Sequence, residues 1–138
     1  MTDLLEIGRA VLQKQPFSLF LGAELLSLET GRATLGLDIR PEFLQQQGFV
    51  HGGVVSYLID NALTFAGGST LGENVVTAEY KLNYLRPARG RRLVATATVD
   101  GKGARLAVCR CEVKSLEEGA ESLCAVGQGT VMMLNSGA

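Results

Sequence analysis

Hydrophobic residues recur along the chain with two different periods, and each change of period marks a predicted element. Apolar residues have helical spacing between Leu4 and Leu12, and Pro16 cannot continue a helix, so residues 3–14 are predicted to form a short amphipathic helix. The period then becomes two. Residues 22–28 and 33–39 are therefore predicted to be two strands, which a short polar link joins into a hairpin.

A long apolar segment, residues 53–66, follows a His-Gly-Gly entry that begins at His51. It is apolar on most of its circumference, which is the pattern of a helix enclosed by other structure, and Gly67-Gly68 is predicted to end it. One line at i, i+4 spacing is polar, and it consists of Ser56, Asp60 and Thr64. A carboxylate inside an otherwise buried helix is costly unless it has partners or a function, so Asp60 is the first candidate for chemistry.

The glycine pair at the start of this helix is a second candidate for chemistry. Glycines let another backbone or a ligand come close, and the first N–H groups of a helix are unpaired and lie at the positive end of its macrodipole. The entry is therefore predicted to stabilise an electron-rich oxygen.

Four more strand-like runs follow, separated by turn residues. Their ranges are 75–85, 91–100, 104–114 and 122–134. Short links of this kind predict an antiparallel meander. In the first run Ala78, Tyr80, Leu82 and Tyr84 alternate with polar residues that include Thr77. Because the central helix is too apolar to lie on a surface, we expect an α+β fold in which one strongly curved antiparallel sheet of about six strands wraps around it.

Composition limits the class of protein. The 138 residues fit one domain, 1–138, and 46% hydrophobic with 20% charged residues is typical of a soluble globular protein. No apolar run reaches the ~20 residues of a membrane span, and the start of the chain does not resemble a secretion signal, so we expect a cytoplasmic protein without a membrane partner. A net charge of −1 argues against general nucleic-acid binding.

The three cysteines, Cys109, Cys111 and Cys124, cannot all pair with one another. One histidine and no second cysteine pair cannot build a tetrahedral zinc site, so no metal site is expected. We interpret the cysteines as reduced core or interface residues rather than disulfides.

Three motifs in this order resemble a known family. The first is Gly48-x-x-His51-Gly52-Gly53, the second is Asp60 nine positions after the histidine, and the third is Thr77-Ala78-Glu79-Tyr80 leading to Tyr84-Leu85-Arg86-Pro87-Ala88. Together they resemble the hot-dog-fold acyl-CoA thioesterases of the phenylacetic-acid-degradation (PaaI-type) family, and the resemblance covers nearly the whole chain. It implies hydrolysis of an acyl-coenzyme A thioester, with coenzyme A as part of substrate and product and no other cofactor.

The resemblance also implies a role for each matching residue. Asp60 matches the catalytic carboxylate, which acts as general base for water or as a direct nucleophile. Gly52 matches the glycine whose backbone N–H polarises the thioester carbonyl, and His51 matches the histidine near the leaving sulfur. Thr77 matches a position that holds the attacking water, whereas Gln45 stands where the family usually has an asparagine that grips the carbonyl.

The resemblance further implies a homo-oligomer, either a dimer or a dimer of dimers. Two subunits would join their sheets edge to edge and build the site between them, with Asp60 and Thr77 from one chain and His51, Gly52 and Gln45 from the other. Such pairing would cover the exposed edge of strand 75–85. The residues expected to bind substrate, chiefly the anionic end of coenzyme A, are Gly53, Asn61, Arg86, Arg89, Arg91, Lys102 and Arg105.

Simpler interpretations remain open for several of these residues. His51 could be a structural hydrogen-bonding residue, Thr77 could reflect β-propensity, and the arginines could form a solvated face. The rival functions are a non-catalytic acyl-CoA-binding domain and a hot-dog hydratase or dehydratase, although the acid and histidine motifs of the latter differ from those here. An aryl or a medium-chain acyl group is expected.

Overall fold

The computed structural model describes residues 3–134. Its elements, in chain order, are α1 (Leu4–Leu12), α2 (Pro16–Leu21), β1 (Glu24–Glu29), β2 (Arg32–Asp38), the 3-10 turn η1 (Pro41–Phe43), α3 (Gly52–Leu71), β3 (Val75–Tyr84), β4 (Arg92–Lys102), β5 (Leu106–Glu117) and β6 (Ala120–Met133). The predicted first helix, hairpin, central helix and four later strands all exist, with ends that differ by a few residues.

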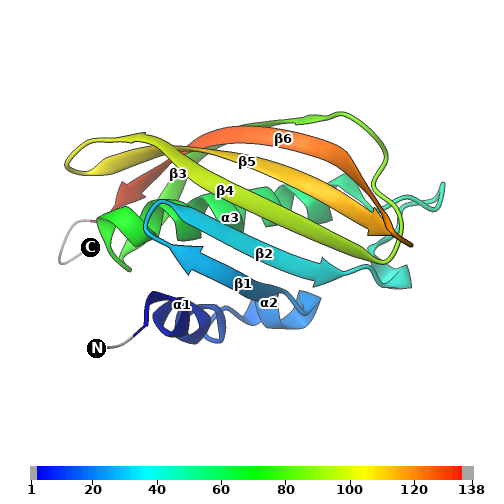
Figure 1. Cartoon of the computed structure of the whole chain (residues 1–138), viewed down its shortest axis with the longest axis horizontal. Coiled ribbons are helices and arrows are strands. Elements are labelled where there is room, and N and C mark those ends of the chain that lie inside the picture. Colours follow the sequence, from blue (N-terminus) through cyan, green and yellow to red (C-terminus); the bar gives the residue numbers. More distant parts are fainter. Residues whose placement is uncertain (1–2, 135–138) are drawn as a thin grey trace.

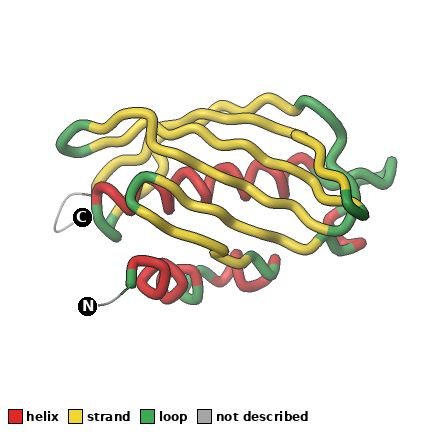
Figure 2. Tube along the Cα trace, viewed as in Figure 1, coloured by secondary structure: helices red, strands yellow, loops and turns green. Residues whose placement is uncertain are grey.

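One six-stranded antiparallel sheet, in the order β1-β2-β4-β5-β6-β3, curves over α3. Figure 1 shows α3 along the concave side of the sheet, with α1 and α2 beside β1 at one edge. Figure 2 shows that the strands form a single layer over the central helix. The expected α+β architecture, that of the hot-dog fold, is therefore confirmed.

The predicted four-stranded meander is wrong for β3. Strands β4, β5 and β6 are joined in sequence, but β3 pairs with β6 and lies at the opposite edge from β1. The link between β3 and β4 is residues 85–91, too long for a tight hairpin, and it lets the chain cross the end of the sheet. Strand β3 is consequently an edge strand: β6 lies on one side of it, and no strand of residues 3–134 lies on the other.

The predicted end of the central helix is also wrong. Helix α3 continues through Gly67-Gly68 and ends at Gly72, whose φ of 112° suits glycine. Gly67 instead permits close packing, because a Cβ at this position would lie 2.7 Å from the Val131 Cβ of β6. The absence of a side chain at Gly67 thereby lets the inner face of α3 pack closely against the sheet.

Helix α2 is an element that the sequence pattern did not reveal. Pro16 ends α1, as predicted, but it is also the first residue of α2, where its fixed φ and missing N–H are tolerated. Gly22, with φ 80°, then turns the chain into β1. The apolar side of α1 packs on β1, where a Cβ at Gly8 would lie 2.6 Å from Leu25 Cδ2. The N-terminal helices therefore cover the β1 edge of the sheet.

The clean alternation predicted for β3 is interrupted by a β-bulge. Thr77 pairs with Val131 and Glu79 pairs with Thr130, so that Ala78 is an extra residue without a partner. Val75 and Thr77 are half-buried before the bulge, and the half-buried residues after it are the even-numbered Tyr80 and Leu82. The bulge thus lets Thr77 and Tyr80 point toward the same side, although they stand three residues apart.

The three cysteines are buried and free, as predicted. Burial raises the pKa of Cys109 to about 11 and that of Cys111 to about 12. Burial therefore keeps both thiols protonated at neutral pH. Of the helices in the described part of the chain, none has the length and apolarity to cross a membrane.

Candidate active site

A row of polar groups on α3 faces the edge strand β3, and we call it the polar ladder. The hydroxyls of Ser56 and Tyr80 lie 2.6 Å apart, and Thr77 donates a hydrogen bond of 2.6 Å to Asp60 Oδ1. At the start of the helix, the Tyr84 hydroxyl donates to the Gly52 carbonyl over 2.8 Å. The ladder consists of Gly52, Ser56, Asp60 and Thr64 of α3 with Thr77, Tyr80 and Tyr84 of β3.

Asp60 is held at the centre of this ladder. Each threonine hydroxyl has one proton, and the Thr77 proton goes to the Asp60 carboxylate, which can only accept. Thr64 Oγ1 donates its proton to the Asp60 carbonyl oxygen over 2.8 Å, and it also lies 2.8 Å from Thr77 Oγ1. Asp60 Oδ1 is thus oriented, while Oδ2 accepts no hydrogen bond from residues 3–134. A half-buried carboxylate with one fixed and one free oxygen is suited to bind and deprotonate water.

His51 is the N-cap of α3. Its Nδ1 accepts a hydrogen bond of 2.9 Å from the Gly53 N–H, and its carbonyl accepts one from the Val54 N–H. The imidazole therefore has its remaining proton on Nε2 when neutral, and Gly53 has no backbone donor left for a substrate. The Gly52 N–H makes no hydrogen bond within the described residues. Gly52 thus offers the donor that the sequence assigned to it.

Gln45 lies near this donor, but its side chain is occupied. Its Oε1 accepts hydrogen bonds from the backbone N–H groups of Gln47 and Phe49, which closes the turn before the helix. Gln45 and Gly52 line the same pocket of about 390 Å³, together with Tyr84 and Arg86. The side-chain amide of Gln45 therefore lies near the Gly52 N–H, but its hydrogen bonds stabilise the loop that precedes the helix.

The structure separates Asp60 from Gly52 within one chain. They are eight residues apart on a continuous helix, which corresponds to about 12 Å along its axis. One carbonyl group cannot contact both at hydrogen-bonding distance. The predicted residues accordingly fall into two groups in each chain, Asp60 with Thr77 at the middle of α3, and His51, Gly52 and Gln45 at its start.

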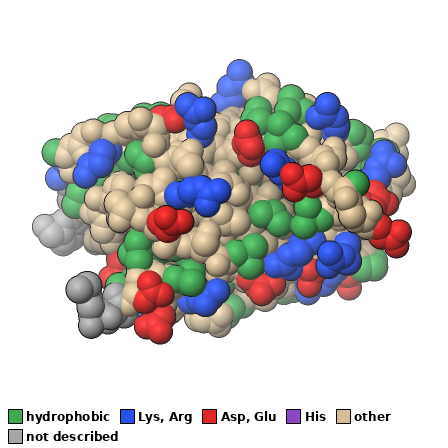
Figure 3. Space-filling view, in the orientation of Figure 1, with side chains coloured by type: hydrophobic (Ala, Val, Ile, Leu, Met, Phe, Trp, Pro, Cys, Tyr) green, Lys and Arg blue, Asp and Glu red, His purple; other side chains and the backbone are tan. Residues whose placement is uncertain are grey.

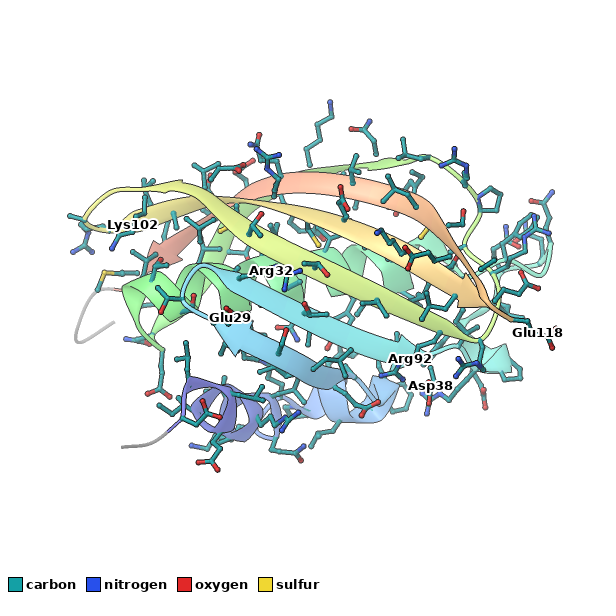
Figure 4. The ribbon with its side chains drawn as sticks, viewed as in Figure 1. Glu29, Arg32, Asp38, Arg92, Lys102 and Glu118 are labelled. Atoms are coloured by element: carbon teal, nitrogen blue, oxygen red, sulfur yellow. The ribbon has the colours of Figure 1, made fainter. Side chains whose placement is uncertain are left out.

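The predicted coenzyme A residues are also divided. Arg86 donates to the Leu123 carbonyl, and the Arg89 guanidinium lies 4.7 Å from the centre of the Phe49 ring, so both belong to the end of the molecule that holds the start of α3. Arg91 immediately precedes β4 at this same end. Lys102 ends β4, and Figure 4 shows it at the opposite end of the strand from Arg92.

Strand β4 separates these two ends by roughly 33 Å, given about 3.3 Å per residue. Arg105 follows in the turn after Lys102. Figure 3 shows charges of both signs interspersed on the outer face of the sheet, where ion pairs such as Arg92 with Asp38 lie. The cations therefore do not form one patch within a single chain.

Asn61 faces away from the ladder. Its Nδ2 donates to Gln15 Oε1 over 3.0 Å and to the Tyr57 hydroxyl over 3.0 Å, and it lies 3.3 Å from Ser18 Oγ. Tyr57 in turn donates to buried Ser18 over 2.6 Å. This network holds α2 against α3, so the contacts of Asn61 are structural in this structure.

Sequence reasoning missed two ladder residues. Thr64 stands in the polar line of the central helix and received no role from the sequence, yet it contacts Thr77 and the Asp60 backbone. The signal was its position four residues after Asp60. Tyr80 likewise received no role in the ladder, and only the bulge brings its hydroxyl to Ser56. Residues 3–134 contain no group of three or more His, Cys, Asp or Glu side chains that could hold a metal ion.

Comparisons with known proteins indicate the family of the chain. A model of the thioesterase superfamily matches residues 47–122. The medium/long-chain acyl-CoA thioesterase YigI of Escherichia coli K12 is 29% identical over 129 residues, which cover 81% of this chain and 83% of that protein. The crystal structure of a thioesterase family protein from Silicibacter pomeroyi superposes with a TM-score of 0.91 at 33% identity, covering 96% of this chain and 98% of that one.

A third similarity concerns the fold alone. The PaaI protein from the phenylacetic acid degradation operon of Escherichia coli superposes with a TM-score of 0.84 at 22% identity. The matched part covers 96% of this chain and 94% of that chain. The two proteins therefore share the same arrangement of sheet and central helix.

Proposed function

Because the chain belongs to the thioesterase superfamily and is a thioester hydrolase, we propose that it hydrolyses an aryl- or medium-chain acyl-CoA thioester to the free acid and coenzyme A. The observation that carries this proposal is the Asp60 carboxylate, oriented by Thr77 on an otherwise apolar helix. The relative in Escherichia coli is named for medium- and long-chain acyl-CoA substrates, which supports the same substrate class.

In this mechanism Asp60 Oδ2 accepts a proton from water as the water oxygen attacks the thioester carbon. The carbonyl oxygen gains negative charge, which the Gly52 N–H stabilises, and the C–S bond then breaks as the sulfur leaves with the bonding pair. Asp60 returns the proton to the products. Neither a metal nor a bound cofactor has a part in these steps.

The direct alternative is attack by Asp60 itself, which gives a mixed anhydride that water then cleaves. Label in Asp60 after a single turnover in ¹⁸O-labelled water would establish the anhydride route, because only attack of water on the aspartyl carbon of the anhydride places its oxygen there. Mass spectrometry of the peptide that contains Asp60 is the measurement.

The site is proposed to form between two copies of the chain. About 12 Å separates Asp60 from the Gly52 donor of its own chain, whereas an antiparallel pairing of two β3 edges would bring the helix start of one copy toward the middle of the other. Arg86, Arg89 and Arg91 lie at that helix start and would accompany it. They are then suited to bind the phosphates of coenzyme A, whereas Lys102 and Arg105 lie at the other end.

The first test is thiol release from a panel of phenylacetyl-, hydroxybenzoyl- and straight-chain acyl-CoA thioesters. We expect Asp60→Asn to lower kcat by about 10²–10⁴-fold, which is the typical contribution of a general base, while acyl-CoA binding persists. Asp38→Asn is the matched control, because Asp38 is also hydrogen-bonded but lies on the outer end of β2 beside Arg92. Binding without turnover by the wild type would instead indicate a non-catalytic acyl-CoA-binding domain.

The second test addresses the shared site. Gly52→Pro removes the N–H donor and should preserve the helix, because proline fits the first helical position and His51 already has the ψ of 135° that precedes a proline. Gly52→Ala retains the N–H and is its control, since either substitution must displace the exposed Tyr84 hydroxyl.

Mixing inactive Asp60→Asn and Gly52→Pro subunits should restore about a quarter of wild-type activity, because half of the dimers are mixed and each mixed dimer has one intact site. A site built within one chain would recover no activity in this mixture. Sedimentation of the mixture checks that the dimers form and exchange subunits.

A further inference from the structure

A small pocket lies between α1 and the second half of α3, next to the polar ladder. It has a volume of about 130 Å³ and its lining is mostly apolar. Gly68 contributes no side chain, and a Cβ at this position would lie 3.3 Å from Val75 Cγ2 of β3. Its principal side chains are Leu4, Ile7 and Val11 of α1, Thr64 and Phe65 of α3, and Val75 of β3.

This pocket adjoins the Asp60 site. Thr64 lines the pocket and also contacts Thr77, which donates to the Asp60 carboxylate. Val75 lines it as well, and residues two apart on a strand point to the same side. A substrate carbonyl at Asp60 therefore has an apolar space one helical turn further along α3. Asn61 and Gln15, which are hydrogen-bonded to one another, border the pocket on the α2 side, and Glu73 borders it beyond the end of α3.

The size of the pocket limits the acyl group that it can hold. A cavity of about 150 Å³ accommodates benzene, so a pocket of about 130 Å³ has room for a group of about that size at most. At about 30 Å³ per water-sized group, the space holds roughly four carbon atoms. The one charged residue of the lining, Glu73, is exposed, and the mostly apolar remainder is suited to the end of a saturated chain.

On these grounds, and resting on the proposed thioesterase function, we propose that the α1–α3 pocket binds the end of a linear medium-length acyl chain, with α1 as the wall that limits its length. Each methylene that enters the pocket should raise kcat/KM by about fourfold, until the chain fills the space against α1 and gains no more. The pocket thus sets an upper limit to the favoured chain length.

The test compares kcat/KM for straight-chain acyl-CoA substrates from two to sixteen carbons in three variants. Val11→Phe fills the pocket and should move the optimum to a chain shorter by two or more carbons, with at least a tenfold loss on the best wild-type substrate and less than a twofold loss on acetyl-CoA. Ile7→Ala enlarges the pocket and should move the optimum to a longer chain. Ala10→Phe, on the exposed side of the same helix, is the matched control and should leave the profile unchanged.

The outcomes separate this inference from the proposed function. Turnover with the same length profile in all variants, or an optimum on aryl substrates that Val11→Phe does not alter, overturns the pocket assignment and leaves the thioesterase intact. Absence of turnover of any thioester by the wild type overturns the proposed function. Thermal unfolding of each variant ensures that the comparison is made on folded protein, and opposite shifts in Val11→Phe and Ile7→Ala cannot arise from partial unfolding.

Discussion

The two faces of α3 have opposite properties although they belong to the same helix. On the face toward the sheet, Leu58, Ile59 and Leu63 expose none of their surface. On the face toward β3, Ser56, Asp60 and Thr64 are half-buried and hydrogen-bonded. The difference follows from position, because β3 is the edge strand and the polar ladder lies at the border of the sheet, where water and substrate can arrive.

Stability and catalysis therefore depend on different faces of the central helix. The inner face contributes burial of apolar surface, which depends on shape. The polar ladder contributes oriented hydrogen bonds, which add little net stability yet determine where a proton can go. Substitutions on the two faces should therefore alter different measurements.

The largest effect is expected on the inner face. Leu63→Ala should lower the free energy of unfolding by about 2–5 kcal/mol, because it leaves a cavity against the sheet. Urea denaturation measures this loss, and kcat of the folded fraction should stay within twofold of the wild type. Leu71→Ala, at the half-buried end of the same helix, is the control and should cost less. A large loss of kcat in Leu63→Ala would contradict the separation of the two faces.

Thr77→Val tests the ladder itself. The substitution keeps the shape of the side chain but removes the hydrogen bond to the Asp60 carboxylate, and such a bond to a charged group is worth about 1.5–3 kcal/mol. We expect kcat of the folded protein, whose fraction urea unfolding fixes, to fall by about 10–100-fold. Thr77→Ser keeps the hydroxyl and should retain most activity. Equal activity of the valine and serine variants would show that Asp60 needs no orientation.

The buried thiol of Cys111 should make the free energy of unfolding depend on pH in the alkaline range. Burial raises the pKa of Cys111 to about 12, whereas an unfolded thiol titrates near 8.5. The stability that the protonated Cys111 thiol contributes is fully present below pH 8.5. It is lost as the pH rises toward 12, since only the unfolded state releases the thiol proton in this range. Between pH 8.5 and 10 the wild type should lose about 2 kcal/mol more stability than Cys111→Ala. Parallel curves for the two proteins would mean that the thiol is accessible to water.

The smallest effect is expected at the hydrogen bond between Ser56 and Tyr80. Ser56→Ala should cost about 1 kcal/mol of stability and leave kcat within twofold, because this pair lies one turn away from Asp60. Tyr80→Phe removes the other partner, and the double variant completes a cycle whose coupling energy measures the bond. A coupling near zero would show that this step of the ladder contributes nothing.

Much of the fold follows from periodicity in the sequence. The hairpin of β1 and β2, the central helix and the succession β4, β5 and β6 were all predictable from alternation and turn residues. The place of β3 was not, because pairing between distant strands depends on the whole sheet rather than on a local pattern. Helix α2 was missed because six residues after a proline are too few to display a period.

The site was predictable in part. Asp60 stood out as an acid on an apolar helix, and the structure brings Thr77, the other candidate expected from the same chain, into hydrogen-bonding contact with it. The separation of Lys102 from Arg86 could not be read from the sequence, since it depends on the course of β4 from one end of the sheet to the other. The structural network of Asn61 depends on α2, which was itself not predicted.

The bulge in β3 also affects how related sequences should be compared. Ala78 is accommodated without a partner, so that Thr77 and Tyr80 both face α3 although a regular strand would turn them to opposite sides. A homologue with an unbroken strand would present the same two hydroxyls with one residue fewer between them. Search patterns of fixed length would pass over such a protein, and a correct alignment must open a gap inside this strand rather than in a loop.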